Sequence, residues 1–378
     1  MKLRFAVIML AVVTTSLFSS LRTQAHPATG IVVDRKGQVY FSDLETIWKI
    51  DLQGKLSVFR AGVSGRHVHE LSIDDQDNIY GADLSYNPAT KGFPSDVWKM
   101  TPEGKFTYLL EPTEHPPRGI SIWRDREGNM YLVDQNNHTK SQTLLLRRSP
   151  DGKVTTLAGS SYGHKDGRGT EANFSSVGGM AFGTDGSLYL TDGTSVRKVL
   201  MDGTVTTLAK DLNFRTAEDK PALFGGAYGS LAGLGVDRNG NVYVADAGNR
   251  RLLKIGTDGK VEVVYRAEPP FFPNGVVATP TGDIYVMEVG FTPPSSSSGP
   301  RVRKLSSAGK NEIVAVEGTE AQSGSQVAPV EKAGPSTETV VKAYSLAGPL
   351  RYVMVLLSVG LIIFSFVIWK RKRRERQA

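Results

Sequence analysis

Residues 235–264 read GVDRNGNVYVADAGNRRLLKIGTDGKVEVV, and this stretch decides the fold. The turn signals DRNG and GTDG separate short runs that are rich in Val, Leu, Ile and Tyr. Asp, Asn and Gly supply turn conformations, and β-branched or aromatic residues alternating with polar ones are typical of strands. The stretch therefore predicts a four-stranded antiparallel meander, with one strand before DRNG, two flanking ADAGNR and one after GTDG.

The tyrosine of this meander recurs along the chain, each time with an acid three residues later. The six pairs are Tyr40 and Asp43, Tyr80 and Asp83, Tyr131 and Asp134, Tyr189 and Asp192, Tyr243 and Asp246, and Tyr285 and Glu288. Successive tyrosines are 40 to 58 residues apart. Repeats of this length are typical of propeller blades, which close radially and so protect their sheet edges. We predict an all-β fold, a six-bladed β-propeller of four-stranded antiparallel blades over residues 26–316.

The acid after each tyrosine is interpreted as architectural, because a residue present in every blade normally serves the repeat itself. It would cap the turn after the second strand of its blade. Glu288 is the one copy that departs from Asp. Since it also precedes a long loop rich in Pro and Ser, Glu288 is kept as a candidate ligand-binding residue.

The two ends of the chain predict a membrane protein. Residues 1–25 combine a charged start, an apolar run and short residues, as in a cleavable signal peptide, with an uncleaved anchor as the alternative. An uncharged segment within 346–370 is long enough for a transmembrane helix, and the basic residues 371–378 behind it favour a cytoplasmic tail. Residues 317–345, rich in Ser, Thr, Pro, Gly and Glu, predict a disordered stalk. We expect a single-pass cell-membrane protein with an extracytoplasmic N-terminal domain.

Charge and composition exclude several classes of function. The formal net charge of +7 arises at the ends, because residues 1–25 carry +3 and residues 370–378 carry +5, which leaves −1 for the rest. A neutral domain gives no reason to expect nucleic-acid binding. The chain has no cysteine, which excludes disulfides, thiol chemistry and thiolate metal sites.

The repeat at 235–264 resembles the NHL repeat. Residues 158–183, AGSSYGHKDGRGTEANFSSVGGMAFG, are similar to the connection between NHL blades, in which a DGxG turn precedes the next innermost strand. The resemblance covers all six blades and is strongest in the fourth and fifth. It implies a six-bladed propeller, and because NHL propellers are mainly binding scaffolds, it implies a fold more than an activity.

One blade differs from its siblings where the innermost strand begins. We call the two residues at this point the start pair, and in blades 1 to 6 the pairs are Thr29-Gly30, His69-Glu70, Arg118-Gly119, Gly178-Gly179, Ala232-Gly233 and Asn274-Gly275. Innermost strands line a propeller's channel, so the candidate ligand-binding residues Glu70, Arg118 and Asn274 are expected to face a common axis with His69. The longest loops, 84–96, 135–142 and 289–300, are expected on the same face, which predicts a binding mouth there.

A second resemblance bears on Glu70. The gluconolactonase and senescence-marker-protein (SMP-30) propellers place a metal-binding Glu at the start of one innermost strand and an Asn before Gly at another. Glu70 and Asn274-Gly275 match these two elements, so the resemblance implies Glu70 and Asn274 as metal ligands for Ca²⁺ or another divalent cation. The family's further ligands would come from start pairs that here contain Gly178 and Ala232.

The same residues allow other interpretations. Glu70 could form a buried salt bridge with Arg118, act with His69 as a general acid and base, or orient a carboxylate or sugar ligand together with Arg118. His67 and His69 could share a transition metal. We expect a membrane-tethered binding or scaffold domain for a protein, glycan or small ligand. The alternative is a divalent-metal-dependent hydrolase or lactonase with His69 as the catalytic residue.

Overall fold

The computed structural model describes residues 30–89, 95–109, 123–125, 127–135, 141–219, 231–292 and 296–316. The chain divides into two units, 1–322 and 323–378, and every described residue lies in the first. The predicted signal peptide 1–25, stalk 317–345, transmembrane helix 346–370 and tail 371–378 lie outside the described residues, as does Arg118. In the part of the chain that is described, no helix is long and apolar enough to cross a membrane.

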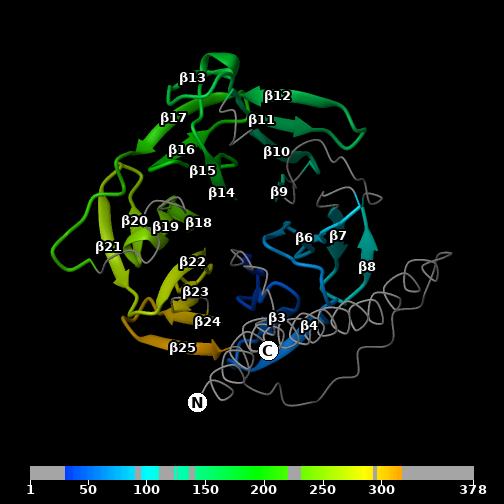
Figure 1. Ribbon diagram of the computed structural model, residues 1–378, viewed down its shortest axis with the longest axis vertical. Helices are drawn as coiled ribbons and strands as arrows, with labels where there is room; N and C mark the ends of the chain where they lie inside the picture. The colour runs from blue at the N-terminus through cyan, green and yellow to red at the C-terminus, as the bar shows by residue number, and fades with distance from the viewer. Residues whose placement is uncertain are drawn as a thin grey trace, which may run out of the picture. The chain divides into compact units, whose positions relative to one another are not determined.

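The described strands form six antiparallel sheets, each built from strands that follow one another along the chain (Figure 1). Blades 1 to 3 consist of β1 (Ile31–Val33), β2 (Val39–Ser42), β3 (Ile47–Ile50), β4 (Leu56–Arg60); β5 (Leu71–Ile73), β6 (Ile79–Leu84), β7 (Ser95–Met100), β8 (Phe106–Tyr108); and β9 (Trp123–Arg124), β10 (Met130–Gln135), β11 (Thr143–Arg148), β12 (Val154–Ala158). Blades 4 to 6 consist of β14 (Val177–Phe182), β15 (Leu188–Asp192), β16 (Ser195–Val199), β17 (Thr204–Ala209) with β13 (Gly167–Arg168); β18 (Leu231–Val236), β19 (Val242–Asp246), β20 (Arg251–Ile255), β21 (Val261–Arg266); and β22 (Phe271–Ala278), β23 (Ile284–Thr292), β24 (Ser296–Leu305), β25 (Asn311–Val316). The predicted six-bladed propeller is confirmed.

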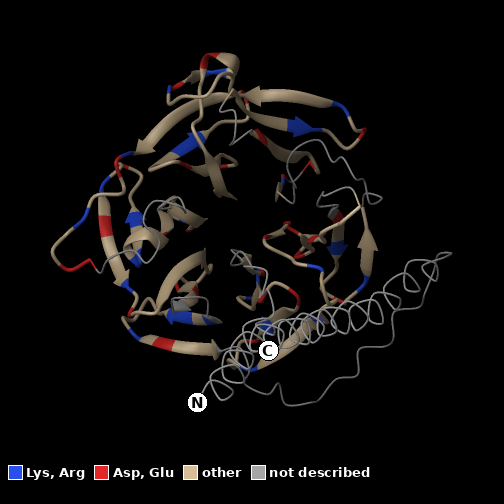
Figure 2. Ribbon diagram, viewed as in Figure 1, with Lys and Arg blue, Asp and Glu red and all other residues tan. Residues whose placement is uncertain are grey.

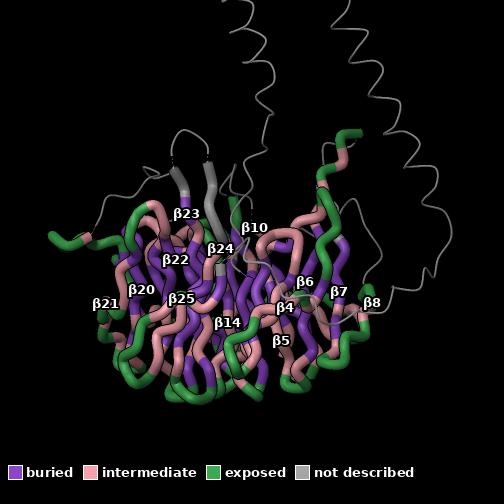
Figure 3. The backbone as a smooth tube through the Cα atoms, turned by 90° about the horizontal axis from the view of Figure 1, so that it is seen from below, coloured by how far each residue is buried: buried purple, intermediate pink, exposed green. Residues whose placement is uncertain are grey.

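The blades close into a ring through their innermost strands. Strand β1 contacts both β5 and β22, and β18 contacts both β14 and β22. Blades 3 and 4 are joined by Trp123, whose Nε1 donates to the Met180 carbonyl at 2.9 Å. Blades 6 and 1 share one apolar cluster, in which Phe41 packs with Met287 and Val302. Buried residues fill the body of the ring and exposed residues gather at its turns (Figure 3).

The repeated tyrosine anchors the first turn of its own blade. In blade 3, Asp125 Oδ1 accepts from the Asn129 amide N–H at 2.8 Å, while Asp125 Oδ2 accepts from Asn129 Nδ2 and from the Tyr131 hydroxyl, both at 2.7 Å. Blade 2 repeats the pattern with Asp74 and Tyr80. An Asp side chain that bonds the backbone ahead of it stabilises a turn locally. The tyrosine recurs because it is the hydrogen-bond partner of that turn.

Two details of the meander differ from the prediction. Blade 4 has five strands, because the connection from blade 3 folds back and its β13 pairs with β17, so four strands is wrong for this blade. In blade 6, β23 and β24 extend through most of the expected loop 289–300, with Gly290 opposite Ser298. Val289 and Phe291 continue the alternation that favours a strand, which extends the pairing.

Glycine recurs in the start pairs because neighbouring blades approach closely there. A Cβ added to Gly179 would lie 2.9 Å from the Ala232 carbonyl oxygen, and one added to Gly233 would lie 2.8 Å from the Asn274 carbonyl oxygen. Gly30 meets blade 2 in the same way, since its added Cβ would lie 2.9 Å from the Leu71 amide nitrogen. In each case the obstacle is backbone, which cannot move aside as a side chain can.

We therefore expect Gly233→Ala to destabilise the ring. Overpacking of this kind typically costs about 1–3 kcal/mol, and chemical denaturation of the full chain would measure it. Gly163→Ala is the control, because the nearest atom to its added Cβ is the Asn173 Cβ at 3.4 Å, an ordinary contact. Equal stability of the two variants would contradict the close approach.

Candidate functional site

The segment that carries His69 and Glu70 is held rigidly between blades 1 and 2. His67 and Leu84 exchange backbone hydrogen bonds of 2.8 and 2.9 Å, and the Val68 amide N–H donates to the Leu44 carbonyl at 2.6 Å. Ser42 Oγ donates to the Val68 carbonyl at 2.7 Å, and the Val68 side chain is fully buried. These contacts fix the backbone at residues 67 and 68, directly before His69 and Glu70.

Glu70 occupies the position that glycine takes in the neighbouring start pairs. The Gly30 amide N–H donates to the His69 carbonyl at 2.9 Å, so blade 1 lies directly against this point of blade 2. Strand β5 begins at Leu71, after the start pair, whereas β14, β18 and β22 include Gly179, Gly233 and Gly275. In blade 2 the carboxylate therefore stands one residue before the innermost strand begins.

The surroundings of Glu70 disfavour its charged form. Its side chain is half-buried, and burial raises the pKa of this carboxyl from 4.5 to about 7. Within the described ranges no cation forms an ion pair with Glu70. The expected pairing with Arg118 stays a prediction, because Arg118 is outside those ranges. A carboxyl in such a setting can hold or release a proton near neutral pH.

Two histidines accompany Glu70. The rings of His67 and His69 meet at 72° with their centroids 6.1 Å apart, and both side chains are half-buried. His67 lies two residues before His69 on the same extended segment, which places their side chains on one side of the backbone. Two histidine rings therefore lie together where blade 1 meets blade 2, next to Glu70 along the chain.

Asn274 lies at the same end of the ring, on the other side of blade 1. It belongs to β22, its side chain is buried, and β1 contacts both β22 and β5. The structure thus places Asn274 and Glu70 on the two blades that flank blade 1.

Glu288 lies in a network of its own. Its Oε1 accepts from the Tyr265 hydroxyl at 2.5 Å, and its Oε2 accepts from Arg301 Nε at 2.7 Å and Arg303 Nε at 3.2 Å. The pKa of Tyr265 is raised, mainly by burial and secondly by its hydrogen bond to Glu288. Glu288 is fully buried, and its described hydrogen bonds join blade 5 to blade 6 rather than cap a turn, the role predicted for the repeated acid. A role in ligand binding stays a prediction.

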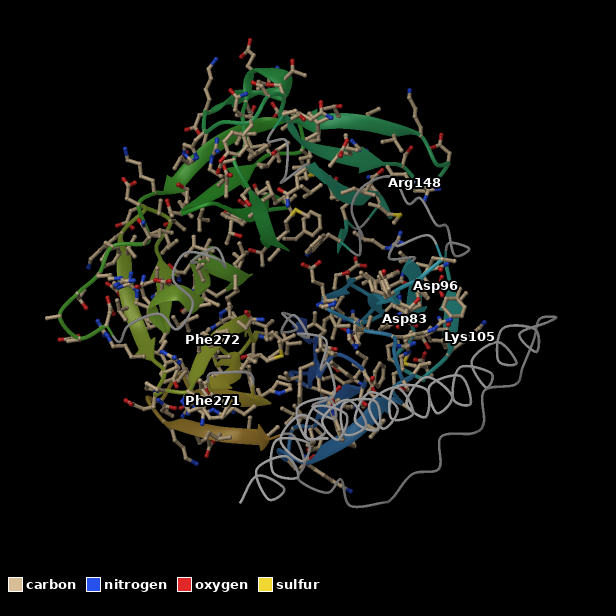
Figure 4. The ribbon with its side chains drawn as sticks, in the orientation of Figure 1. Asp83, Asp96, Lys105, Arg148, Phe271 and Phe272 are labelled. Atoms are coloured by element: carbon tan, nitrogen blue, oxygen red, sulfur yellow. The ribbon has the colours of Figure 1, made fainter. Side chains whose placement is uncertain are left out.

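Other acids of the repeat are held in a similar way. Asp83 accepts two hydrogen bonds from Arg60, the last residue of blade 1, at 2.8 and 2.6 Å. Asp96 lies beside Asp83 on the next strand and pairs with Arg66 at 2.8 Å (Figure 4). In blade 1, Asp43 accepts from the amides of Glu45 and Thr46 and so caps the turn, as predicted. These carboxylates stabilise the junctions between blades and the turns within them.

The described residues do not form the calcium site that the second resemblance implies. Glu70 and Asn274 would supply two oxygen ligands, but Gly178 has no side chain and Ala232 offers only a methyl group. A Cβ at Gly178 would lie 2.7 Å from Thr191 Oγ1, so a metal-ligating side chain at this position would require Thr191 to move. Within the described ranges no group of three His, Asp or Glu side chains could hold a metal ion. Calcium prefers six or more oxygen ligands.

Comparison with known proteins finds likeness of fold only. No protein-family model and no curated protein matches the chain. A virginiamycin B lyase structure from Staphylococcus aureus is 17% identical with a TM-score of 0.44, over 76% of this chain and 83% of that one. The calcium-binding protein regucalcin from Agrobacterium tumefaciens is 15% identical with a TM-score of 0.44, over 69% and 83%.

A gluconolactonase structure from Xanthomonas campestris is 14% identical with a TM-score of 0.43, over 69% of this chain and 83% of that one. At such values these likenesses carry no argument about activity. The NHL resemblance of residues 235–264 stays a prediction. The six-bladed architecture rests on the strand order of this chain.

Proposed function

We propose that this propeller is a membrane-tethered, extracytoplasmic binding domain whose ligand contacts the end of the ring where Glu70 lies. One observation carries the proposal. Described start pairs of other blades keep a glycine against the backbone of the next blade, whereas blade 2 places a carboxylate there. Because the blade structure favours glycine at this position, we attribute Glu70 to ligand binding rather than to the stability of the blade.

The chemistry of the site indicates the kind of ligand. Glu70 offers a half-buried carboxyl, His69 and His67 offer ring nitrogens, and Asn274 lies one blade away. Such groups bind hydrogen-bond donors and cations. A protein, glycan or small ligand that presents hydroxyl, amino or ammonium groups would fit. The tether is proposed from the sequence alone, since the segments concerned lie outside the described residues.

The test compares two substitutions of the same residue. Glu70→Gln keeps the size of the side chain, and Glu70→Gly restores the residue that the repeat prefers, so both should fold. The full chain in detergent would be screened by thermal unfolding against hexoses, hexosamines, spermidine and Ca²⁺. We expect at least one probe to raise the melting temperature of the wild type saturably and to lose most of that effect in both variants.

Two results would decide against this proposal. Equal stabilisation of wild type and Glu70→Gly by every effective probe, or no stabilisation by any probe, would contradict binding at Glu70. Hydrolysis of a lactone or ester by the wild type that is lost in Glu70→Gln would favour the hydrolase instead.

A further inference from the structure

Aligning the blades strand by strand reveals a second departure from the repeat, at the opposite end of the innermost strands. There the last residue of the first strand, the first of the second and the last of the third lie side by side in each sheet. These triplets are Val33, Val39 and Ile50; Ile73, Ile79 and Met100; Arg124, Met130 and Arg148; Phe182, Leu188 and Val199; Val236, Val242 and Ile255; and Ala278, Ile284 and Leu305. Five triplets are wholly apolar, while blade 3 has arginine at two of its three positions.

Arg124 takes a place that an aromatic ring fills elsewhere. Its guanidinium lies 4.7 Å from the centre of the Tyr80 ring of blade 2. At the next junction the equivalent residue, Phe182 of blade 4, packs edge-on against Tyr131 of blade 3 with their centroids 5.4 Å apart. Arg124 therefore fills the junction of blades 2 and 3 with a charged group where the fold accepts an apolar one.

Arg148 belongs to β11, the third strand of blade 3, where it lies opposite Met130 (Figure 4). Its Nη1 lies 3.9 Å from the sulfur of Met130, the residue between the two arginines. Burial lowers the pKa of Arg124, and the nearby charge of Arg148 lowers it further, while Tyr80 and Asp74 act in the opposite direction. Lys99 adds a third cation, since its Nζ lies 5.8 Å from the centre of the same Tyr80 ring. Positive charge is thus concentrated at this junction.

Within the described ranges, no carboxylate lies within ion-pair distance of either arginine. Among the described residues Arg124 Nε is also buried without a hydrogen-bond acceptor. Asp74, whose charge acts on Arg124, has its oxygens engaged by Asn78, Gln76 and Tyr80. Basic and acidic residues are both distributed over the blades of the ring (Figure 2), whereas Arg124, Arg148 and Lys99 gather at this junction. A partly buried guanidinium that no carboxylate balances destabilises a fold.

We propose that the junction of blades 2 and 3 binds an oxyanion, the phosphate or carboxylate group of a small ligand, through Arg124 and Arg148. Arginine presents several N–H donors in a planar fork that matches such groups. Both side chains are half-buried, so solvent and a small anion can reach them. The site lies at the far end of the innermost strands from Glu70 and does not depend on the function proposed there.

Inorganic phosphate is the first probe and acetate the second, each titrated against the full chain in detergent at constant ionic strength. We expect phosphate, acetate or both to raise the melting temperature of the wild type saturably. Arg148→Leu, which installs the residue of blade 6, should weaken that binding roughly ten-fold or more, the usual effect of losing a charge-assisted hydrogen bond. A response to phosphate alone would identify a phosphate group, and an equal response to acetate would identify a carboxylate.

Arg147→Leu is the matched control. It removes the same charge from the adjacent residue of β11, whose side chain faces the other way and lies opposite Tyr131. This variant should keep the anion response. Without added anion, Arg124→Val and Arg148→Leu should be at least as stable as the wild type, because apolar residues serve these positions in the other blades.

Three results would overturn the proposal. The first is the lack of a saturable response of the wild type to either anion. The second is an equal loss of response in Arg147→Leu and Arg148→Leu, which would reveal general charge attraction. The third is a clear loss of stability in Arg124→Val without anion, together with an unchanged anion response, which would assign Arg124 a packing role only.

Discussion

Replacing Arg251 by Met is expected to destabilise the propeller by about 3–5 kcal/mol, the usual cost of leaving buried carboxylates without their cation. Arg251 is fully buried in blade 5. Its Nε pairs with Asp246 at 2.8 Å and its Nη1 pairs with Asp219 at 2.6 Å. Nη2 donates to the carbonyls of Leu212 and Phe214, so one side chain fastens the connection from blade 4 onto blade 5. Denaturant unfolding followed by far-UV circular dichroism would measure the loss.

Two further variants make this test specific. Arg251→Lys keeps the charge but cannot reach all four acceptors at once, so its stability should fall between those of the wild type and Arg251→Met. Arg35→Met breaks the surface pair with Asp77, in which Arg35 is largely exposed, and should change stability by less than about 1 kcal/mol. A loss in Arg251→Met no larger than that in Arg35→Met would refute the fastening role.

Glu70→Gln is expected to stabilise the fold at pH 8 and to have little effect near pH 4. The pKa of Glu70 is about 7 when folded and has its ordinary value of 4.5 when unfolded, so between these values the folded state binds more protons. Wild-type stability must therefore fall as the pH rises from about 4.5 to about 7. Gln cannot ionise, so the stability of Glu70→Gln does not decrease in this way. Above pH 7 the variant should exceed the wild type in free energy of unfolding by about 3 kcal/mol at most.

Unfolding of both proteins across pH 4 to 8 would measure this difference. Glu127→Gln, which removes the same charge from an exposed turn, is the control for net charge. If the stability curves of wild type and Glu70→Gln ran parallel over the whole range, the burial of Glu70 would have no energetic consequence. A ligand that pairs with ionised Glu70 should restore the wild-type stability at pH 8 and leave Glu70→Gln unchanged.

The blades could be predicted from the sequence because their signals are local. Tyr131 bonds Asp125, six residues earlier, and Asp43 caps amides two and three residues later. Such contacts repeat with the sequence and need no knowledge of the ring. Strand β13 could not be predicted, because its two residues become a strand only when the chain folds back over β17.

The site was only partly predictable, for the same reason. Glu70 can be predicted because every repeat has a start pair at the same place in its sequence, but the partners of Glu288 include Tyr265 of another blade. Arg124 and Arg148 escape an alignment based on tyrosines and start pairs, since each lies at a strand end. Their departure is visible only at the strand ends, where the equivalent residues of the other five blades are apolar.

That each sheet is made of consecutive strands has a consequence for how such a ring can evolve. Among the described strands none is exchanged between blades 1 and 6, which meet through side-chain packing between whole sheets. A change in which blade comes first along the chain would therefore leave every sheet intact. Each blade is a transferable module that can diverge by itself. Blade 2 has diverged at the start of its innermost strand, with Glu70, and blade 3 at the end of its innermost strand, with Arg124. The other blades keep the common pattern at these positions.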